Sequence, residues 1–128
     1  MFSILAEGCV CAKMISGTIE GADLVIPIND FFIVKDGKKT TRKYVVVQND
    51  KLKYPVCVYR FSDDEYSALW MSCTHQQTEL RAFGDKLQCP AHGSEFSNKG
   101  EVQNGPAETP LRSFRVTREN DLLKISLT

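Results

Sequence analysis

The sequence predicts an all-β fold, a sandwich or barrel built from short strands. Apolar and β-branched runs such as Tyr44–Gln48 and Val56–Phe61 alternate with turn signals. Asp36-Gly37 is a turn signal of this kind, and no stretch shows the period of a long amphipathic helix. With 128 residues, the chain has the size of one domain with a modest hydrophobic core.

Turn signals place the strands in order along the chain. In the first half, strands are expected at Ile15–Ile19, Asp23–Ile28, Phe32–Val34, Tyr44–Gln48, Val56–Phe61 and Leu69–Ser72. In the second half, they are expected at Glu79–Phe83, Lys86–Gln88, Ser94–Phe96, Glu101–Val102, Leu111–Thr117 and Leu122–Leu127. The polar segment Ser62–Tyr66 is expected to be a turn or a helical bend, and hairpins are expected around Gly84-Asp85 and Glu119-Asn120-Asp121.

Charge and hydropathy exclude two classes of function. Sixteen basic and sixteen acidic residues cancel, and no long run of one sign indicates nucleic acid. The chain as given contains no stretch of about 18 apolar residues and does not span a membrane by itself. Residues 1–13 are expected to be a flexible N-terminal lead-in, and residues 14–128 a single domain.

Two clusters of cysteine and histidine carry the strongest functional signal. They are Cys73-Thr-His75 and Cys89-Pro-Ala-His92, and they contain the only two histidines of the chain. The hairpin expected between them would bring the clusters side by side. Two thiolates and two imidazoles are the donors of a [2Fe–2S] cluster with cysteines on one iron and histidines on the other. Such a cluster moves one electron at a time, and its imidazoles can couple electron uptake to proton uptake.

Other uses of these donors are weighed against a cluster. Two cysteines and two histidines also suit a tetrahedral zinc ion, so a zinc-bound structural or interaction module is the alternative of another class. Zinc fingers usually separate the cysteines from the histidines, whereas each cluster here is mixed. A complete ring oxygenase needs a second iron site of two histidines and a carboxylate, and no histidine is left to build one.

Further motifs between Ser72 and Leu111 extend the pattern. They are His92-Gly-Ser-Glu-Phe96, Asn98-Lys-Gly100-Glu-Val102 and Gly105-Pro-Ala107-Glu-Thr-Pro110-Leu111. With them, the chain resembles the Rieske iron–sulfur proteins. The resemblance implies a Rieske-like antiparallel β sandwich, with a small cluster-binding subdomain at one tip formed by loops within residues 72–111.

The resemblance also implies a ligand set for a Rieske-type [2Fe–2S] cluster. Cys73 and Cys89 would bind the inner iron, and His75 and His92 the outer iron, with their free ring edges toward solvent or a partner. Ser94 would donate a hydrogen bond to a cluster sulfur, which raises the reduction potential.

The residues around the four candidate ligands do not point to one subtype of Rieske protein. Respiratory members commonly carry a further cysteine in each loop, and these two form a disulfide, but the matching positions here hold Thr78 and Ala91. Many respiratory members have a tyrosine where this chain has Phe96, which is expected to pack and exclude water. Yet Ser94 and the motif at 105–107 look respiratory. The expected potential therefore lies between those of respiratory members and Rieske ferredoxins.

The expected function is one-electron transfer, as a small electron carrier or a tethered redox subunit. Its partners would be a protein donor and a protein acceptor. The alternative is the Rieske subunit of a quinol-oxidising membrane complex. The chain holds no complete active site of its own, so it is at most an oxidoreductase component. It would be cytoplasmic, or periplasmic at the cell envelope if the N-terminus is a truncated or lipidated anchor.

Three cysteines lie outside the two clusters. Cys57 sits in a strand-like run and is expected to be a small, buried, apolar side chain. Cys9 and Cys11 lie in the lead-in, where they are free, joined to another group or, in the case of Cys9, a lipid attachment site.

Overall fold

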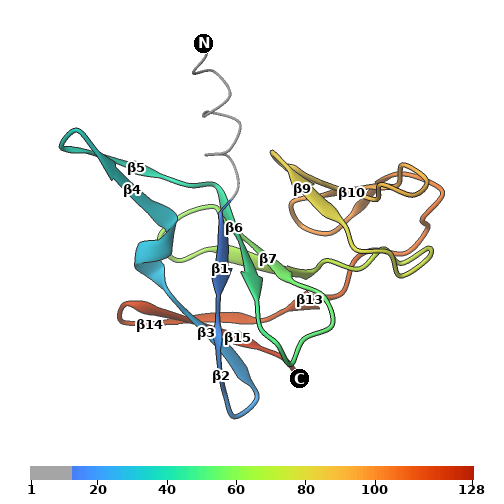
Figure 1. The fold of residues 1–128 in the computed structure, drawn as a ribbon. Coiled ribbons are helices and arrows are strands. Elements are labelled where there is room, and N and C mark those ends of the chain that lie inside the picture. Colours follow the sequence, from blue (N-terminus) through green and yellow to red (C-terminus); the bar gives the residue numbers. More distant parts are fainter. Residues whose placement is uncertain (1–12) are drawn as a thin grey trace.

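The computed structural model describes residues 13–128, and the regular structure in this part of the chain is almost wholly β (Figure 1). This confirms the predicted all-β fold. The lead-in expected at residues 1–13, with Cys9 and Cys11, lies outside the described residues except for Lys13. A short 3₁₀ helix, η1 (Ile28–Phe31), follows the third strand, and no helix within residues 13–128 is long and apolar enough to cross a membrane.

The strands are short and follow one another closely. In chain order they are β1 (Met14–Ser16), β2 (Thr18–Glu20), β3 (Asp23–Pro27), β4 (Phe32–Lys35), β5 (Lys38–Thr41), β6 (Tyr44–Gln48), β7 (Val56–Arg60), β8 (Tyr66–Trp70), β9 (Arg81–Phe83), β10 (Lys86–Gln88), β11 (Glu95–Ser97), β12 (Val102–Asn104), β13 (Ser113–Phe114), β14 (Val116–Glu119) and β15 (Leu122–Ser126).

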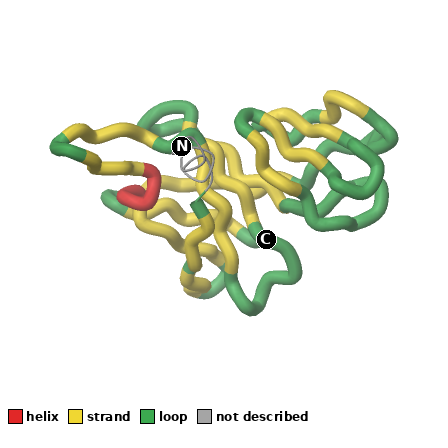
Figure 2. The backbone as a smooth tube through the Cα atoms, turned by 45° about the horizontal axis from the view of Figure 1, so that its top comes forward, coloured by secondary structure: helices red, strands yellow, loops and turns green. Residues whose placement is uncertain are grey.

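A central five-stranded sheet lies between two apolar cores. Its strand order is β1-β6-β7-β8-β13. The first core joins it to the sheet β14-β15-β3-β2, and the second core joins it to the sheet β12-β11-β10-β9. The latter sheet and its loops form a small lobe at one side of the molecule (Figures 1 and 2). The expected sandwich with a small subdomain at one tip is thus confirmed, although β1 pairs with β6 in parallel.

Strands β6 and β7 read as continuous apolar runs because the central sheet is covered on both faces. Along β6, Val45 and Val47 belong to the first core, whereas Tyr44 and Val46 belong to the second. Successive side chains of a strand point to opposite faces, so a polar residue at any of these positions would face a core. The sequence of β6 therefore shows no alternation of polar and apolar residues.

Cys57 lies on β7 in the second core, where it is buried and free. This confirms the prediction of a small, buried, apolar side chain. Burial raises the pKa of the Cys57 thiol, and the hydrogen bond with the side chain of Tyr59 opposes this rise only in part. The thiol therefore stays protonated and is a poor nucleophile and metal ligand.

Tyr59, two residues further along β7, fastens the small lobe to the central sheet. Its ring is buried, and its hydroxyl lies 3.2 Å from the carbonyl oxygen of Gly84 and 3.3 Å from that of Lys86. One carbonyl group belongs to the turn between β9 and β10 and the other to the first residue of β10, and the single O–H proton is shared between them. The turn itself is the hairpin expected at Gly84-Asp85.

Strands β5 and β8 differ from expectation, and the expected strand Leu111–Thr117 is divided into β13 and β14, which belong to different sheets. The polar sequence of β5 was not expected to be a strand, yet it pairs with β4 through a two-residue turn. Asp36 (φ 54°) and Gly37 (φ 76°) are both left-handed there, as the tight hairpin turn requires. Strand β8 begins at Tyr66 rather than Leu69, because Tyr66 pairs with Arg60 and its ring packs 5.8 Å from that of Phe31. The turn expected at residues 62–66 is correspondingly shorter.

Gly17 divides the expected strand Ile15–Ile19 into β1 and β2, which belong to different sheets. A Cβ atom at this position would lie 2.7 Å from Leu24 Cδ1 and 2.7 Å from Val47 Cγ1. Both neighbours are fully buried in the first core. Glycine is therefore needed where the chain crosses from one layer to the other.

We predict that Gly17→Val destabilises the fold by about 1–3 kcal/mol, because the added side chain must displace two packed core residues. Urea unfolding followed by tryptophan fluorescence measures the change. Ser16→Ala, at the exposed neighbouring position, is the control and should stay within about 0.5 kcal/mol of the parent. Equal stability of Gly17→Val and the parent would contradict the close packing of Leu24 and Val47 against Gly17.

Candidate metal centre

Three loops meet in the small lobe and carry the residues singled out by the sequence. The first loop (residues 73–78) follows β8, the second (89–94) joins β10 to β11, and the third (105–111) follows β12. An isolated bridge between Ser72 and Glu79 closes the first loop at its base. Loops form much of the outer edge of this lobe (Figure 2).

The first loop is a tight turn around the backbone of Cys73. The N–H of Cys73 donates to the carbonyl oxygen of Thr78 at 2.8 Å, and the N–H of Gln77 donates to the carbonyl oxygen of Cys73 at 2.6 Å. Gln77 has a left-handed backbone, with φ of 57°. Its carbonyl oxygen accepts a hydrogen bond from the hydroxyl of Tyr54 at 2.5 Å, which braces this unusual conformation from outside the loop.

The second loop repeats the same backbone pattern. The N–H of Cys89 donates to the carbonyl oxygen of Ser94 at 2.8 Å, and the N–H of Gly93 donates to the carbonyl oxygen of Cys89 at 3.0 Å. Gly93, four residues after the cysteine like Gln77 in the first loop, is also left-handed, with φ of 82°. Two similar turns therefore present one cysteine and one histidine each.

The two cysteines lie inside the lobe and are not joined by a disulfide. Cys73 is 1% exposed and Cys89 is 2% exposed, and both belong to the second core. Burial tends to raise the pKa of Cys89, but hydrogen bonds from the backbone of His92 and Ala91, and from the side chains of Cys73 and Thr78, lower the pKa below its ordinary value. The site thus favours the thiolate, the form that binds metal.

The side chains of the two histidines lie at the surface of the first and second loops. His75 and His92 are both exposed, and their ring centroids are 5.6 Å apart in an edge-to-face arrangement. The structure therefore holds the candidate ligands as a buried thiol pair and an exposed imidazole pair. That these four side chains bind one cluster, with the cysteines on the inner iron, stays a prediction.

Ser94 and Thr74 tie the third loop to the other two. The buried hydroxyl of Ser94 accepts a hydrogen bond from the N–H of Ala107 at 3.0 Å. The hydroxyl of Thr74 donates to the carbonyl oxygen of Thr109 at 2.7 Å. Sequence reasoning missed Thr74, although a hydroxyl residue between two candidate ligands was a visible signal. The O–H proton of Ser94 is not used by this bond and can be donated elsewhere.

Phe96 lies beneath the loops rather than at their surface. It is fully buried in the second core with Leu87, Cys73 and Cys89. Its ring adds no hydrogen-bond donor, and it packs in the core that also contains both thiols. This agrees with the expected role in packing.

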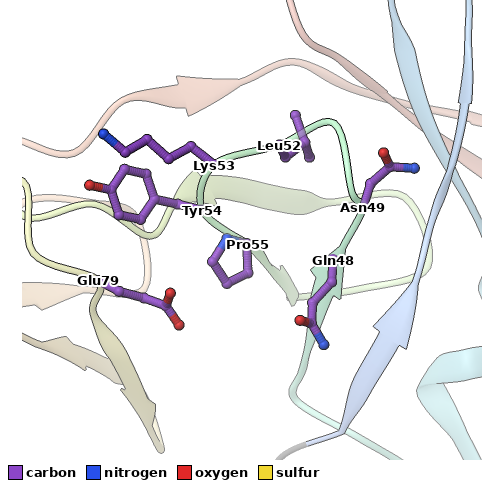
Figure 3. Close-up of a pocket in the computed structure, with 7 residues that line it drawn as sticks. All are labelled: Gln48, Asn49, Leu52, Lys53, Tyr54, Pro55 and Glu79. Atoms are coloured by element: carbon purple, nitrogen blue, oxygen red, sulfur yellow. The ribbon is translucent and has the colours of Figure 1, made fainter.

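None of the four candidate ligands lines a small pocket beside the first loop (Figure 3). It has a volume of about 100 Å³ and is lined by Gln48, Asn49, Leu52, Lys53, Tyr54, Pro55 and Glu79. Pro55 lies between the side chains of Gln48 and Glu79 (Figure 3). Because Tyr54 also bonds to Gln77, this pocket belongs to the wall that supports the first loop.

The donors fit a cluster of two irons. Within residues 13–128, no three histidine, cysteine or acidic side chains gather closely enough to hold one metal ion. The candidate ligands lie instead in two pairs, Cys73 with Cys89 and His75 with His92. A [2Fe–2S] cluster with mixed ligands takes them in such pairs, one pair on each iron. A zinc ion would need all four donors around one point.

Comparisons with known proteins agree with this geometry. The family model described as Rieske [2Fe-2S] domain matches residues 30–115. The chain is 27% identical over 124 residues to "Cytochrome b6-f complex iron-sulfur subunit 2" of Trichormus variabilis, a match that covers 94% of this chain and 64% of that protein. It spans smaller shares, 45% and 32%, of two other cytochrome b6-f subunits that it matches.

Solved structures share the fold. The plasma membrane Rieske protein from Synechocystis PCC 6803 is 25% identical, with a TM-score of 0.57 over 66% of this chain and 86% of that one. The Sphingomonas yanoikuyae B1 ferredoxin is also 25% identical, with a TM-score of 0.54 over 80% of this chain and 94% of that one.

We predict that Thr74→Val loosens the third loop, because the carbonyl group of Thr109 loses its donor. One hydrogen bond contributes about 1 kcal/mol, so amide exchange at Ala107 and Leu111 should accelerate about fivefold. Hydrogen–deuterium exchange measures this. Thr109→Val is the matched control, since only the backbone of Thr109 takes part in the bond. Unchanged exchange in Thr74→Val would show that the tie does not hold the loop.

Proposed function

The chain belongs to the Rieske [2Fe-2S] domain family, and from this premise we propose that Cys73 and Cys89 bind the inner iron of the cluster and His75 and His92 the outer iron. The observation that carries the proposal is the meeting of two similar turns, with thiols buried below and imidazoles exposed above. The family rules out the alternative of a zinc-bound module. Neutral imidazoles in place of two thiolates reduce the negative charge at the site, which favours reduction.

The function of the chain is one-electron transfer. A bound Rieske cluster supplies reversible one-electron reduction. The chain's own residues shape that property: the second core keeps water away from the thiols, and the exposed rings of His75 and His92 form the surface nearest to a partner. Protein redox partners therefore bind at this tip of the small lobe.

We propose that Ser94 tunes the reduction potential. Its hydroxyl already accepts a bond from Ala107, so its proton is free to be donated toward a cluster sulfur next to Cys89. Phe96 stands where respiratory members have a tyrosine and offers no second donor. One hydrogen-bond donor in place of two supports a reduction potential between those of respiratory members and Rieske ferredoxins.

Quinol oxidation within a membrane complex is the second candidate setting. It is favoured by the likeness to cytochrome b6-f subunits, which extends over 94% of this chain in one of them. The likeness to a ferredoxin favours a mobile carrier instead. Co-purification of the full-length protein with a b-type cytochrome from detergent-solubilised membranes would support the complex. Recovery free of membrane cytochromes would support the carrier.

We predict that Cys89→Ala abolishes cluster binding, because the inner iron loses one of its two thiolates. Iron and sulfide analysis should fall from about two of each per chain to near zero, with loss of the visible absorption and the electron-spin-resonance signal. Cys57→Ala is the matched control, since Cys57 is also buried and free. A full complement of iron and sulfide in Cys89→Ala would contradict the proposed ligands.

We predict that Ser94→Ala lowers the reduction potential by about 20–60 mV. This range converts the typical contribution of one hydrogen bond, about 0.5–1.5 kcal/mol, at about 59 mV per tenfold change. Redox titration of the purified protein measures it. Thr74→Val loosens the same third loop without removing the donor and should change the potential far less. Equal shifts in the two variants would assign the effect to the loop rather than to the hydroxyl.

A further inference from the structure

The hairpin of β4 and β5 projects from the body of the molecule, at the end away from the small lobe (Figures 1 and 2). Its strands pair with each other in a separate two-stranded sheet. A two-stranded ribbon is only marginally stable in water by itself. The electron-transfer tip does not use this hairpin, so its composition needs another explanation.

The hairpin and the residues that follow it are strongly basic. Residues 35–43 contain five lysine or arginine residues and one acidic residue, Asp36, in a chain whose net charge is zero. This segment therefore has a net charge of about +4, which the rest of the chain balances.

Like charges face each other at the free end of the ribbon. Lys35 and Lys38 are directly opposite in the β4–β5 register, and both are exposed. Among the ion pairs of residues 13–128, none includes either lysine. Like charges at opposed positions destabilise a sheet, so an anion that binds between them would relieve a cost that the free chain carries.

Both faces of the ribbon combine apolar and cationic groups. A hollow on one face is lined by Ile33, Lys35, Asp36, Lys38 and Thr40. On the other, Val34 is 72% exposed and the ammonium group of Lys39 lies 4.0 Å from the ring centre of Phe32. A flat protein surface contacts one face of such a ribbon. A lipid headgroup layer can surround both, since it takes apolar side chains inward while lysines reach its phosphates.

We propose that the β4–β5 hairpin is an arm that binds the surface of an anionic membrane. Lysine ammonium groups contact lipid phosphates, and Ile33 and Val34 enter the headgroup region. Asp36 at the turn opposes this attraction, but the basic residues around it outnumber it. Because the arm and the small lobe lie at opposite ends, a domain bound in this way keeps His75 and His92 free for redox partners.

Vesicle sedimentation with the cluster-loaded full chain tests the proposal. The probes are vesicles of phosphatidylcholine with about 30% phosphatidylserine, compared with pure phosphatidylcholine. We expect binding to the mixed vesicles that weakens as salt shortens the range of the attraction. The double variant Lys35→Gln/Lys38→Gln should bind roughly 10- to 30-fold more weakly, since each lysine near such a surface contributes about a fivefold change.

Controls separate charge from other causes of binding. Lys51→Gln/Arg115→Gln removes two exposed basic residues outside the hairpin and should bind within about twofold of the parent. Val34→Ser tests the apolar contact and should weaken binding without changing its dependence on salt. The visible spectrum of each variant reports that it is folded and loaded.

Three outcomes of the vesicle assay would overturn the proposal. They are equal binding to neutral and mixed vesicles, equal losses in the two double variants, and no binding to mixed vesicles at low salt. Lysine-dependent binding to an acidic protein in place of vesicles would assign the arm to a protein partner. That result would also refute the proposed binding to a membrane surface.

Discussion

The second apolar core is the constraint on which the candidate metal centre depends. Cys73 and Cys89 are members of this core, together with residues from β6, β7, β8 and β10. The side chains proposed to bind the inner iron are thus positioned by the packing that holds the small lobe on the central sheet. Burial of both faces of that sheet explains why the strands are so apolar, and it also explains why the thiols are shielded from water while the histidines remain exposed.

Hydroxyl groups tie the loops together in a chain that has Thr78 and Ala91, not cysteines, at the two loop positions where a disulfide would form. Ser94 and Thr74 each contribute one hydrogen bond to the third loop, at about 0.5–1.5 kcal/mol apiece. A disulfide typically contributes about 2–4 kcal/mol, so the two ties together approach its lower range. Unlike a disulfide, they do not depend on an oxidising compartment. Packing and hydrogen bonding thus help to maintain the shape of the centre.

Local sequence patterns predicted the strands, turns and motifs that depend on residues close together in the chain. The runs at β6, β7 and β15, the turn at Gly84-Asp85 and the paired clusters of cysteine and histidine all lie close to where the patterns placed them. The strand β5 was missed because its pairing depends on the turn rather than on apolar residues. The tie from Thr74 to Thr109 joins residues 35 positions apart, and no short pattern encodes such a contact. The same holds for the parallel pairing of β1 with β6.

The shared hydroxyl of Tyr59 has a consequence for how the domain searches for its partners. The hydroxyl of Tyr59 holds Gly84 and Lys86, and the second core packs the small lobe against the central sheet. Bending the lobe away from the sheet would break these two hydrogen bonds and expose part of the second core. Rotation and translation of the whole domain carry the histidine tip toward an acceptor without that cost.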